Sequence, residues 1–262
     1  MTARIRFRLV LLAAAMLAAA PLALPPPAAA SENSVPELLR EGDAFDEKLE
    51  NARALELYLQ ADRLKPNDPE TLWRIARQYA LLMNDARSEE QQQELGEKAL
   101  EYARRGVELN PRHAKSVLSV AICYGRLVRF VPPRMKVEYS RLVKEHAEKA
   151  LELDPTDSYA YHVLGAWNYE LAQMGPFTRT FVKVVYGGMP EASNEEAERL
   201  FRKAVELAPQ RVSHRVELGR TYAALGRKEE ARDELRRALS LPNREKDDAE
   251  SKQRASKTLG QL

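Results

Sequence analysis

A helical-hairpin pattern recurs five times between Ser34 and the C-terminal tail, and no other feature constrains the fold as strongly. Each copy places small and aromatic residues at fixed spacings along two successive amphipathic stretches. The clearest copy begins at Val212 and contains, in order, Leu218, Gly219, Tyr222, Ala231, Leu235 and Ala238. Small side chains at these spacings allow two antiparallel helices to approach closely, so the pattern predicts stacked helical hairpins.

Four prolines mark the ends of successive copies, and each follows a leucine by two positions: Pro66, Pro111, Pro155 and Pro209. Because proline cannot continue a helix, each one ends a second helix. The second helices then align at Ala54/Tyr58/Ala61, Ala99/Ala103/Gly106, Val143/Ala147/Ala150 and Ala197/Phe201/Ala204. The first helices align at Leu38/Gly42/Phe45, Leu72/Ala76/Tyr79, Val117/Ala121/Tyr124, Tyr161/Leu164/Gly165 and Leu218/Gly219/Tyr222. The spacing is that of tetratricopeptide (TPR) units of about 34 residues.

The composition agrees with an all-helical fold. Only 11 of 262 residues are glycine, 31% are charged, and no long alternation of apolar and polar residues predicts a sheet. We therefore expect an all-α, right-handed TPR-like solenoid of about five hairpins in residues 31–245. Residues 246–262 are expected to form a polar capping helix or tail.

The first 30 residues differ in kind from the rest. Arg4, Arg6 and Arg8 precede an apolar run of roughly 16 residues, and alanines 28–30 precede Ser31. This order is typical of a cleavable secretory signal, and the run is short for a membrane span of about 20 residues. We expect cleavage near Ala30 and a periplasmic protein; an uncleaved inner-membrane anchor is the alternative.

Export would leave 38 basic and 39 acidic residues, because the three arginines of the signal are lost. A near-neutral chain without a basic stripe is not expected to bind nucleic acid. The single cysteine, Cys123, cannot form a disulfide within the chain, and its place in the third copy predicts a core position.

Three copies are longer than a TPR unit, since the closing prolines lie 45, 44 and 54 residues apart. The first insertion lies near residues 82–92, where Ser88 and Gln91 predict a helix start. The second contains Pro132 and Pro133, after which a long helix is expected from about Arg134. The third follows Gly175: Pro176 can begin a helix, Gly187 and Gly188 can end it, and Ser193 is expected to cap the next one.

The third insertion is the most distinctive part of the chain. Its predicted helix carries apolar residues on one face, Phe177, Phe181, Val184 and Val185, and basic residues elsewhere, Arg179 and Lys183. Such a face is rarely left in water. We expect it either to pack on Trp167 and Tyr169 of the same copy or to act as a lid over a bound apolar ligand.

The segment from Tyr161 to Glu170, the Phe-Thr-Arg-Thr-Phe insertion and the Tyr-Gly-Gly-Met-Pro-Glu-Ala turn together resemble the regulator of microtubule dynamics family. The likeness extends over roughly Ser34 to Leu241. The resemblance implies a TPR fold with insertions and a binding role rather than a catalytic one. Eukaryotic members associate with microtubules or organelle contact sites, where lipid handling has been proposed; an exported bacterial protein would meet no microtubules.

The sequence offers little for catalysis. The four histidines (113, 146, 162 and 214) are scattered along the repeats, and no metal-binding pair, nucleophile motif or phosphate loop is found. We therefore expect no enzyme activity, no catalytic residue, no metal and no cofactor.

In stacked hairpins the first helices line the concave face, which predicts a binding groove there. Basic and aromatic residues alternate along it: Trp73, Arg77, Lys115, Leu118, Ile122, Arg126, Tyr159, His162, Tyr169, Val216 and Arg220. The leading hypothesis is a scaffold that binds a protein or peptide. The alternative is a carrier of a lipid or other anionic amphiphile. A further alternative is that these residues bind no ligand: Trp73 and Tyr169 pack between repeats, and the arginines are solvated.

Overall fold

The computed structural model describes residues 34–188 and 190–262, and this part of the chain is all-helical. The predicted signal peptide, residues 1–30, lies outside the described residues. The α-helices are α1 (Val35–Glu47), α2 (Asn51–Leu64), α3 (Pro69–Leu82), α4 (Glu89–Leu109), α5 (Ala114–Leu127), α6 (Pro133–Leu153), α7 (Ser158–Ala172), α8 (Pro176–Tyr186), α9 (Asn194–Leu207), α10 (Val212–Ala224), α11 (Lys228–Ser240) and α12 (Asp248–Leu259). Two short 3₁₀ turns, η1 (Met83–Asp85) and η2 (Val128–Phe130), follow α3 and α5.

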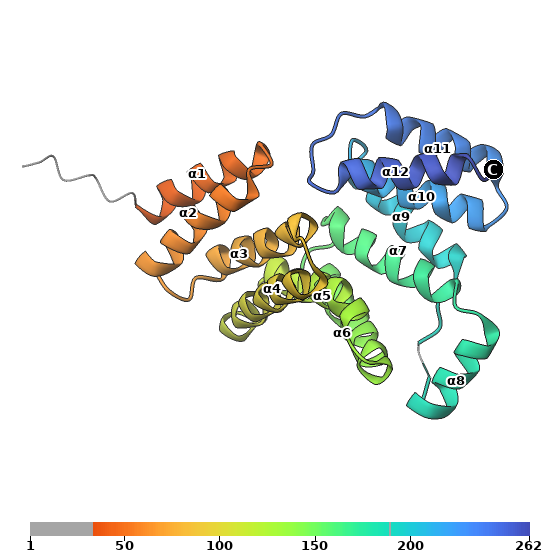
Figure 1. Cartoon of the computed structure of the whole chain (residues 1–262), viewed down its shortest axis with the longest axis horizontal. Helices are drawn as coiled ribbons and strands as arrows, with labels where there is room; N and C mark the ends of the chain where they lie inside the picture. Colours follow the sequence, from red (N-terminus) through yellow and green to blue (C-terminus); the bar gives the residue numbers. More distant parts are fainter. Residues whose placement is uncertain (1–33, 189) are drawn as a thin grey trace, which may run out of the picture. The chain divides into compact units, whose positions relative to one another are not determined.

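Five helical hairpins succeed one another along the chain, as predicted, and build a helical solenoid (Figure 1). They pair α1 with α2, α3 with α4, α5 with α6, α7 with α9, and α10 with α11. Helix α12 packs on α10 and α11 and covers the last hairpin. The aligned small and aromatic residues of the sequence lie between the paired helices.

Glycine and a large side chain meet across three of the hairpins. A Cβ atom on Gly42 would clash with the Tyr58 ring, one on Gly165 would lie 2.8 Å from Phe201, and one on Gly219 would lie 2.7 Å from Leu235. Contacts below 3.0 Å require a neighbouring atom to move, so only glycine allows these helix pairs their present separation. The predicted register of the repeats is therefore confirmed at these contacts.

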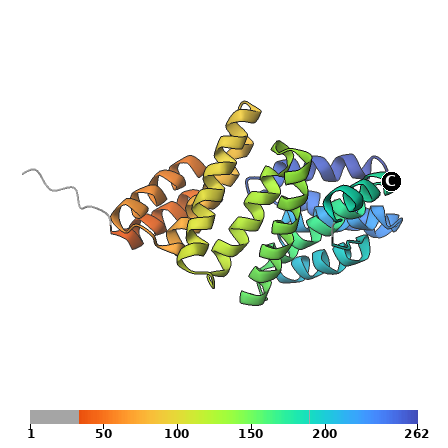
Figure 2. The same cartoon turned by 90° about the horizontal axis from the view of Figure 1, so that it is seen from below.

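The insertions lengthen the second helices and add α8. Helices α4 and α6 each have 21 residues, and Figure 2 shows α4, in yellow, reaching beyond the hairpin of α1 and α2. Ser88 caps α4 by accepting a hydrogen bond from the Gln91 amide (3.2 Å), and Ser193 caps α9 by accepting one from the Glu196 amide (3.1 Å). Helix α8 ends where Gly187 and Gly188 adopt positive φ angles of 75° and 82°.

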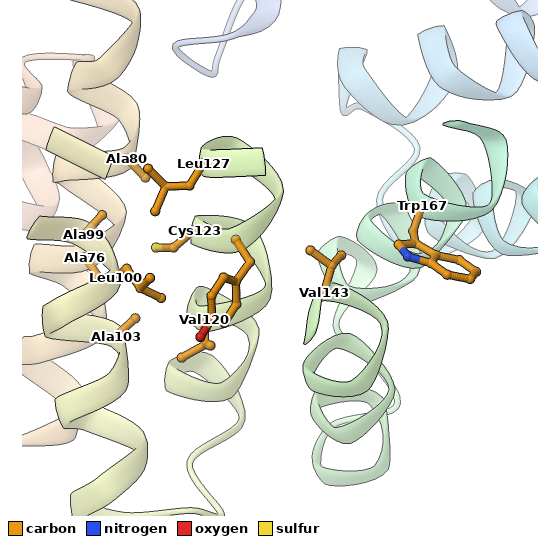
Figure 3. Packing of buried hydrophobic residues seen from close by; sticks show 11 residues of the cluster. Ala76, Ala80, Ala99, Leu100, Ala103, Val120, Cys123, Leu127, Val143 and Trp167 are labelled. Atoms are coloured by element: carbon orange, nitrogen blue, oxygen red, sulfur yellow. The ribbon is translucent and has the colours of Figure 1, made fainter. Parts of the chain in front are cut away.

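Cys123 lies in the largest apolar cluster, where α3, α4, α5 and α6 meet. Figure 3 shows its sulfur directed toward the helices that carry Ala76 and Ala99. Its side chain is 1% exposed, and this burial raises the pKa of the thiol to about 12. The thiol therefore stays protonated near neutral pH, and the described structure gives it a packing role. In the same cluster, the Trp167 indole donates to the Ser140 carbonyl (2.8 Å).

Among residues 34–188 and 190–262, no helix is both long and apolar enough to cross a bilayer.

Candidate functional site

A pocket of about 530 Å³ lies along the first helices of the second to fourth hairpins. Its walls come from α3 and α5, with the start of α7, Arg211 before α10, and Glu245 from the α11–α12 connection. Seven predicted groove residues line it: Trp73, Arg77, Lys115, Leu118, Ile122, Arg126 and Tyr159. The register thus brings together residues that lie up to 86 positions apart, from Trp73 to Tyr159.

The pocket combines an apolar floor with walls that carry both basic and acidic side chains. Leu118 is buried, and Ile122 and Trp73 are half-buried beside it. Arg77 and Arg126 stand on α3 and α5 at the same side of the pocket as the α11–α12 connection. An apolar floor with a few convergent charged groups is the usual composition of a binding cleft.

Each cation of the pocket is paired with a carboxylate of the chain itself. Arg77 binds Asp46 of α1, and Lys115 donates to Asp157 before α7 (2.9 Å). Asp46 is also held by Gln78, whose amide donates to it at 2.9 Å. These two carboxylates come from the adjacent hairpins, so their pairing belongs to the stacking of the repeats.

Arg211 was not predicted, although it is central to the site. Its guanidinium lies 4.4 Å from the centre of the Tyr159 ring, and it pairs with Glu245 at 3.2 Å. It precedes the first residue of α10, immediately outside the helix positions from which the groove was predicted.

His162 is not in the pocket but pairs with His214, with their Nδ1 atoms 3.1 Å apart. Desolvation, with added repulsion from Arg211 and Arg254, lowers the pKa of His162 to about 4. The pKa of His214 is lowered further, mainly by burial and then by His162. Both imidazoles are therefore neutral at pH 7, and the Nδ1–H of one donates a hydrogen bond to the Nδ1 of the other. This pair joins α7 to α10.

Three further groove candidates do not line the pocket. Val216 is fully buried in the cluster formed with Leu235 and Ala255. Tyr169 lies against Arg220, whose guanidinium is 4.8 Å from the ring centre, and Arg220 also pairs with Glu217 at 2.6 Å. The contact between Tyr169 and Arg220 joins α7 to α10.

Helix α8 does not bury its apolar face, contrary to the expectation that this face packs on Trp167 and Tyr169. Phe177 is 90% exposed, Val184 79%, Phe181 55% and Val185 51%. Among the described side chains of α8, only Val182, on the opposite side, is buried, at 8% exposure. The expectation failed because the side of α8 that faces the protein is the one with Val182, while the larger residues point outward.

A second pocket, of about 680 Å³, lies between α8 and the start of α9. It is lined by Arg179 and Lys183 of α8, together with Leu171, Met174 and Glu191. Within the described residues, the groove pocket receives no side chain from α8. Lid closure over the groove would therefore require α8 to move.

The described residues contain no group of three or more potential metal-ligating His, Cys, Asp or Glu side chains. The His162–His214 pair is enclosed by Phe201 and Tyr159, whose rings lie 5.5 and 5.6 Å from those of His162. Neutral, mutually bonded histidines in such a setting serve packing between α7 and α10.

Comparison with known proteins shows the family and the fold of the chain. The chain is 32% identical to regulator of microtubule dynamics protein 1 of Mus musculus over 86% of its own length and 74% of the relative's. It is also 32% identical to the Bos taurus protein of the same name, over 88% of this chain and 73% of that one. A TPR protein of Thermus thermophilus has a similar fold, with a TM-score of 0.61 and 21% identity, over 86% of this chain and 99% of that one. The family model for regulator of microtubule dynamics protein 1-3 matches residues 38–262. The chain therefore belongs to the regulator of microtubule dynamics protein 1-3 family.

Proposed function

We propose that this protein is a non-catalytic scaffold that binds a protein or peptide partner in the pocket formed by α3, α5 and α7. The observation that carries the proposal is the convergence of Trp73, Leu118 and Ile122 with a set of guanidinium groups in one cleft of about 530 Å³. An extended segment can insert apolar side chains between the first helices while its carboxylates meet the arginines. The TPR fold supports a role in protein interaction.

A photo-cross-linking experiment tests this proposal. A benzophenone amino acid at Ile122, inside the pocket, should form an adduct with the partner in cells. The matched position is Glu152 on α6, whose side chain is 65% exposed and lies outside the pocket. An adduct from position 122 that is lost in an Arg126→Glu background supports the proposal. Adducts from position 152 alone would contradict it.

We place this activity in the periplasm, on the strength of the signal-like residues 1–30. The expected mature protein begins near Ser31. N-terminal sequencing of the protein from cells that express it checks this expectation, and a chain that starts at Met1 or Thr2 would refute export with cleavage.

A second candidate function, binding of a lipid or other anionic amphiphile, is favoured by α8 alone. This helix exposes Phe177 and Val184 and presents Arg179 and Lys183 to the adjacent pocket. Amphiphiles combine an acyl chain with an anionic group, which matches this pairing of surfaces. Organic extraction of the purified protein followed by mass spectrometry should release a lipid, and a Phe177→Ser/Val184→Ser variant should retain less of it. No lipid in either extract would remove this candidate.

A further inference from the structure

Three of the four groove cations contact a segment that is distant in sequence. Residues 241–247 connect α11 to α12, and Figure 1 shows this connection extending toward α3. Asp247 accepts a hydrogen bond from Arg126 of α5 (2.6 Å) and one from Asn84 of η1. Glu245 lies 3.2 Å from Arg211 and 3.9 Å from Arg77. Lys246 binds Asp85 at 2.8 Å.

The backbone of this segment is fixed in the form that presents these carboxylates. Buried Asp248 accepts hydrogen bonds from the amides of Arg244 (2.7 Å) and Glu245 (2.8 Å). Helix α12 holds the segment from the other end through Ala255, which packs with Val212 and Leu235. Glu245 and Asp247 are therefore held beside the groove by the hydrogen bonds to Asp248 and by the packing of α12.

The contact itself is one that salt and competing charged groups can weaken. The contacts described above between residues 245–247 and α3, η1 or α5 are hydrogen bonds and ion pairs. The side chains of Arg126 and Asp247 are each 25% exposed, so water reaches them. Partly exposed ion pairs contribute little to stability and weaken with salt. The pairs made by Asp46 and Asp157 differ, because they belong to neighbouring hairpins that must stack in any case.

We infer that residues 241–247 occupy the place of the partner, and that the partner is an acidic extended segment whose carboxylates replace those of Glu245 and Asp247 on Arg77, Arg126 and Arg211. This inference rests on the proposed groove function and adds to it the chemistry of the ligand and its regulation. The chain's own segment acts as a competitive occupant. A partner with a denser row of carboxylates displaces it, while a neutral or basic segment does not.

Binding of a labelled acidic peptide to variants of the full chain tests the inference. The probe is fluorescein-labelled hexaglutamate, followed by fluorescence anisotropy, with hexaglutamine as the matched probe. Glu245→Gln/Asp247→Asn removes the internal carboxylates and should bind hexaglutamate roughly tenfold more tightly than the parent, since the three ion pairs that these carboxylates make with Arg77, Arg126 and Arg211 no longer compete.

Glu229→Gln/Glu250→Gln is the matched control for net charge. It removes the same charge from α11 and α12 at side chains that are 85% and 62% exposed. It should bind as the parent does. Adding Arg126→Gln to Glu245→Gln/Asp247→Asn should abolish the gain, and circular dichroism should show equal helix content in every variant.

Two results would contradict the inference. If Glu245→Gln/Asp247→Asn binds hexaglutamate no more tightly than Glu229→Gln/Glu250→Gln, the segment does not compete and the inference is overturned. An equal gain for hexaglutamine would overturn the acidic character of the ligand. In either case the photo-cross-link at position 122 still reports separately on the groove function, so failure of one proposal is distinguishable from failure of the other.

Discussion

Gly219 is the residue at which a single added carbon has the clearest consequence. Its Cβ position is 2.7 Å from Leu235 Cγ and 3.3 Å from the Leu235 backbone nitrogen. Because the Leu235 backbone, which cannot move aside as a side chain can, forms part of this contact, Gly219→Leu should overpack the interface between α10 and α11. The free energy of unfolding should fall by roughly 1–3 kcal/mol. Ala231→Leu, at a fully buried position, should do the same.

Urea denaturation measures this effect, and Gly175→Ala is the control. No atom lies within 4 Å of the Cβ position of Gly175, and its φ is −62°. The control should match the parent. Parent-like stability of both Gly219→Leu and Ala231→Leu would contradict the packing described here.

The His162–His214 pair should make stability depend on pH. The pKa of His162 is about 4 in the folded protein and near 6.5 when the chain is unfolded, so the unfolded state binds more protons between these values. The contribution of the neutral histidines to stability should therefore be fully present above pH 6.5. It should fall toward pH 4 by up to about 1.4 kcal/mol per pH unit for each histidine.

Urea denaturation between pH 7.5 and 4.5 measures this dependence. His162→Gln should show a smaller loss than the parent, because one titrating group has been removed. The nearby charges of Arg211, Arg254 and Asp247 remain in the variant, so the difference reports on the imidazole. Identical pH profiles would exclude a role for this pair.

At the scale of a single element, α8 should contribute little through its outward face. Phe177 is 90% exposed, so Phe177→Ala should change the free energy of unfolding by no more than about 0.5 kcal/mol. Trp167→Ala, in the core and hydrogen-bonded to Ser140, should cost roughly 3–5 kcal/mol. Thermal and urea unfolding of the two variants measure the contrast, and a large loss for Phe177→Ala would mean that its ring is buried in solution.

At the scale of the whole molecule, α12 should stabilise the C-terminal end of the helical stack by covering it. Deletion of residues 248–262 uncovers Val212, Val216 and Leu235, and should lower the free energy of unfolding by about 2–4 kcal/mol. In a stack whose hairpins contact mainly their neighbours, the loss should be confined to α10 and α11. Hydrogen exchange should therefore accelerate in α10 and α11 and remain unchanged in α2. Uniform acceleration would indicate a single cooperative unit.

The repeat register could be predicted from the sequence because it rests on short-range spacing. Small residues such as Gly42 and Gly165, and aromatic residues such as Tyr58 and Phe201, recur at intervals that one hairpin fixes. The groove was predicted in part for the same reason: Arg77, Leu118 and Arg126 each follow from position within a repeat.

The contributions of Arg211, Glu245 and Asp247 could not be predicted in this way. Their positions depend on the paths of the connections between helices, and the periodicity of the hairpins does not predict those paths. The orientation of α8 was missed for a related reason, because an amphipathic pattern shows that two faces differ but does not determine which one meets the protein. Of the α8 side chains that the structure describes, the buried one is Val182.

The contact between Asp247 and Arg126 also bears on the order in which the molecule assembles. Most packing joins helices that are adjacent in the chain, so each hairpin can form early and locally. Asp247 and Arg126 lie 121 positions apart, and their pairing requires the third, fourth and fifth hairpins to be already in place. The link between Arg126 and Asp247 can therefore form only after the third, fourth and fifth hairpins have docked on one another.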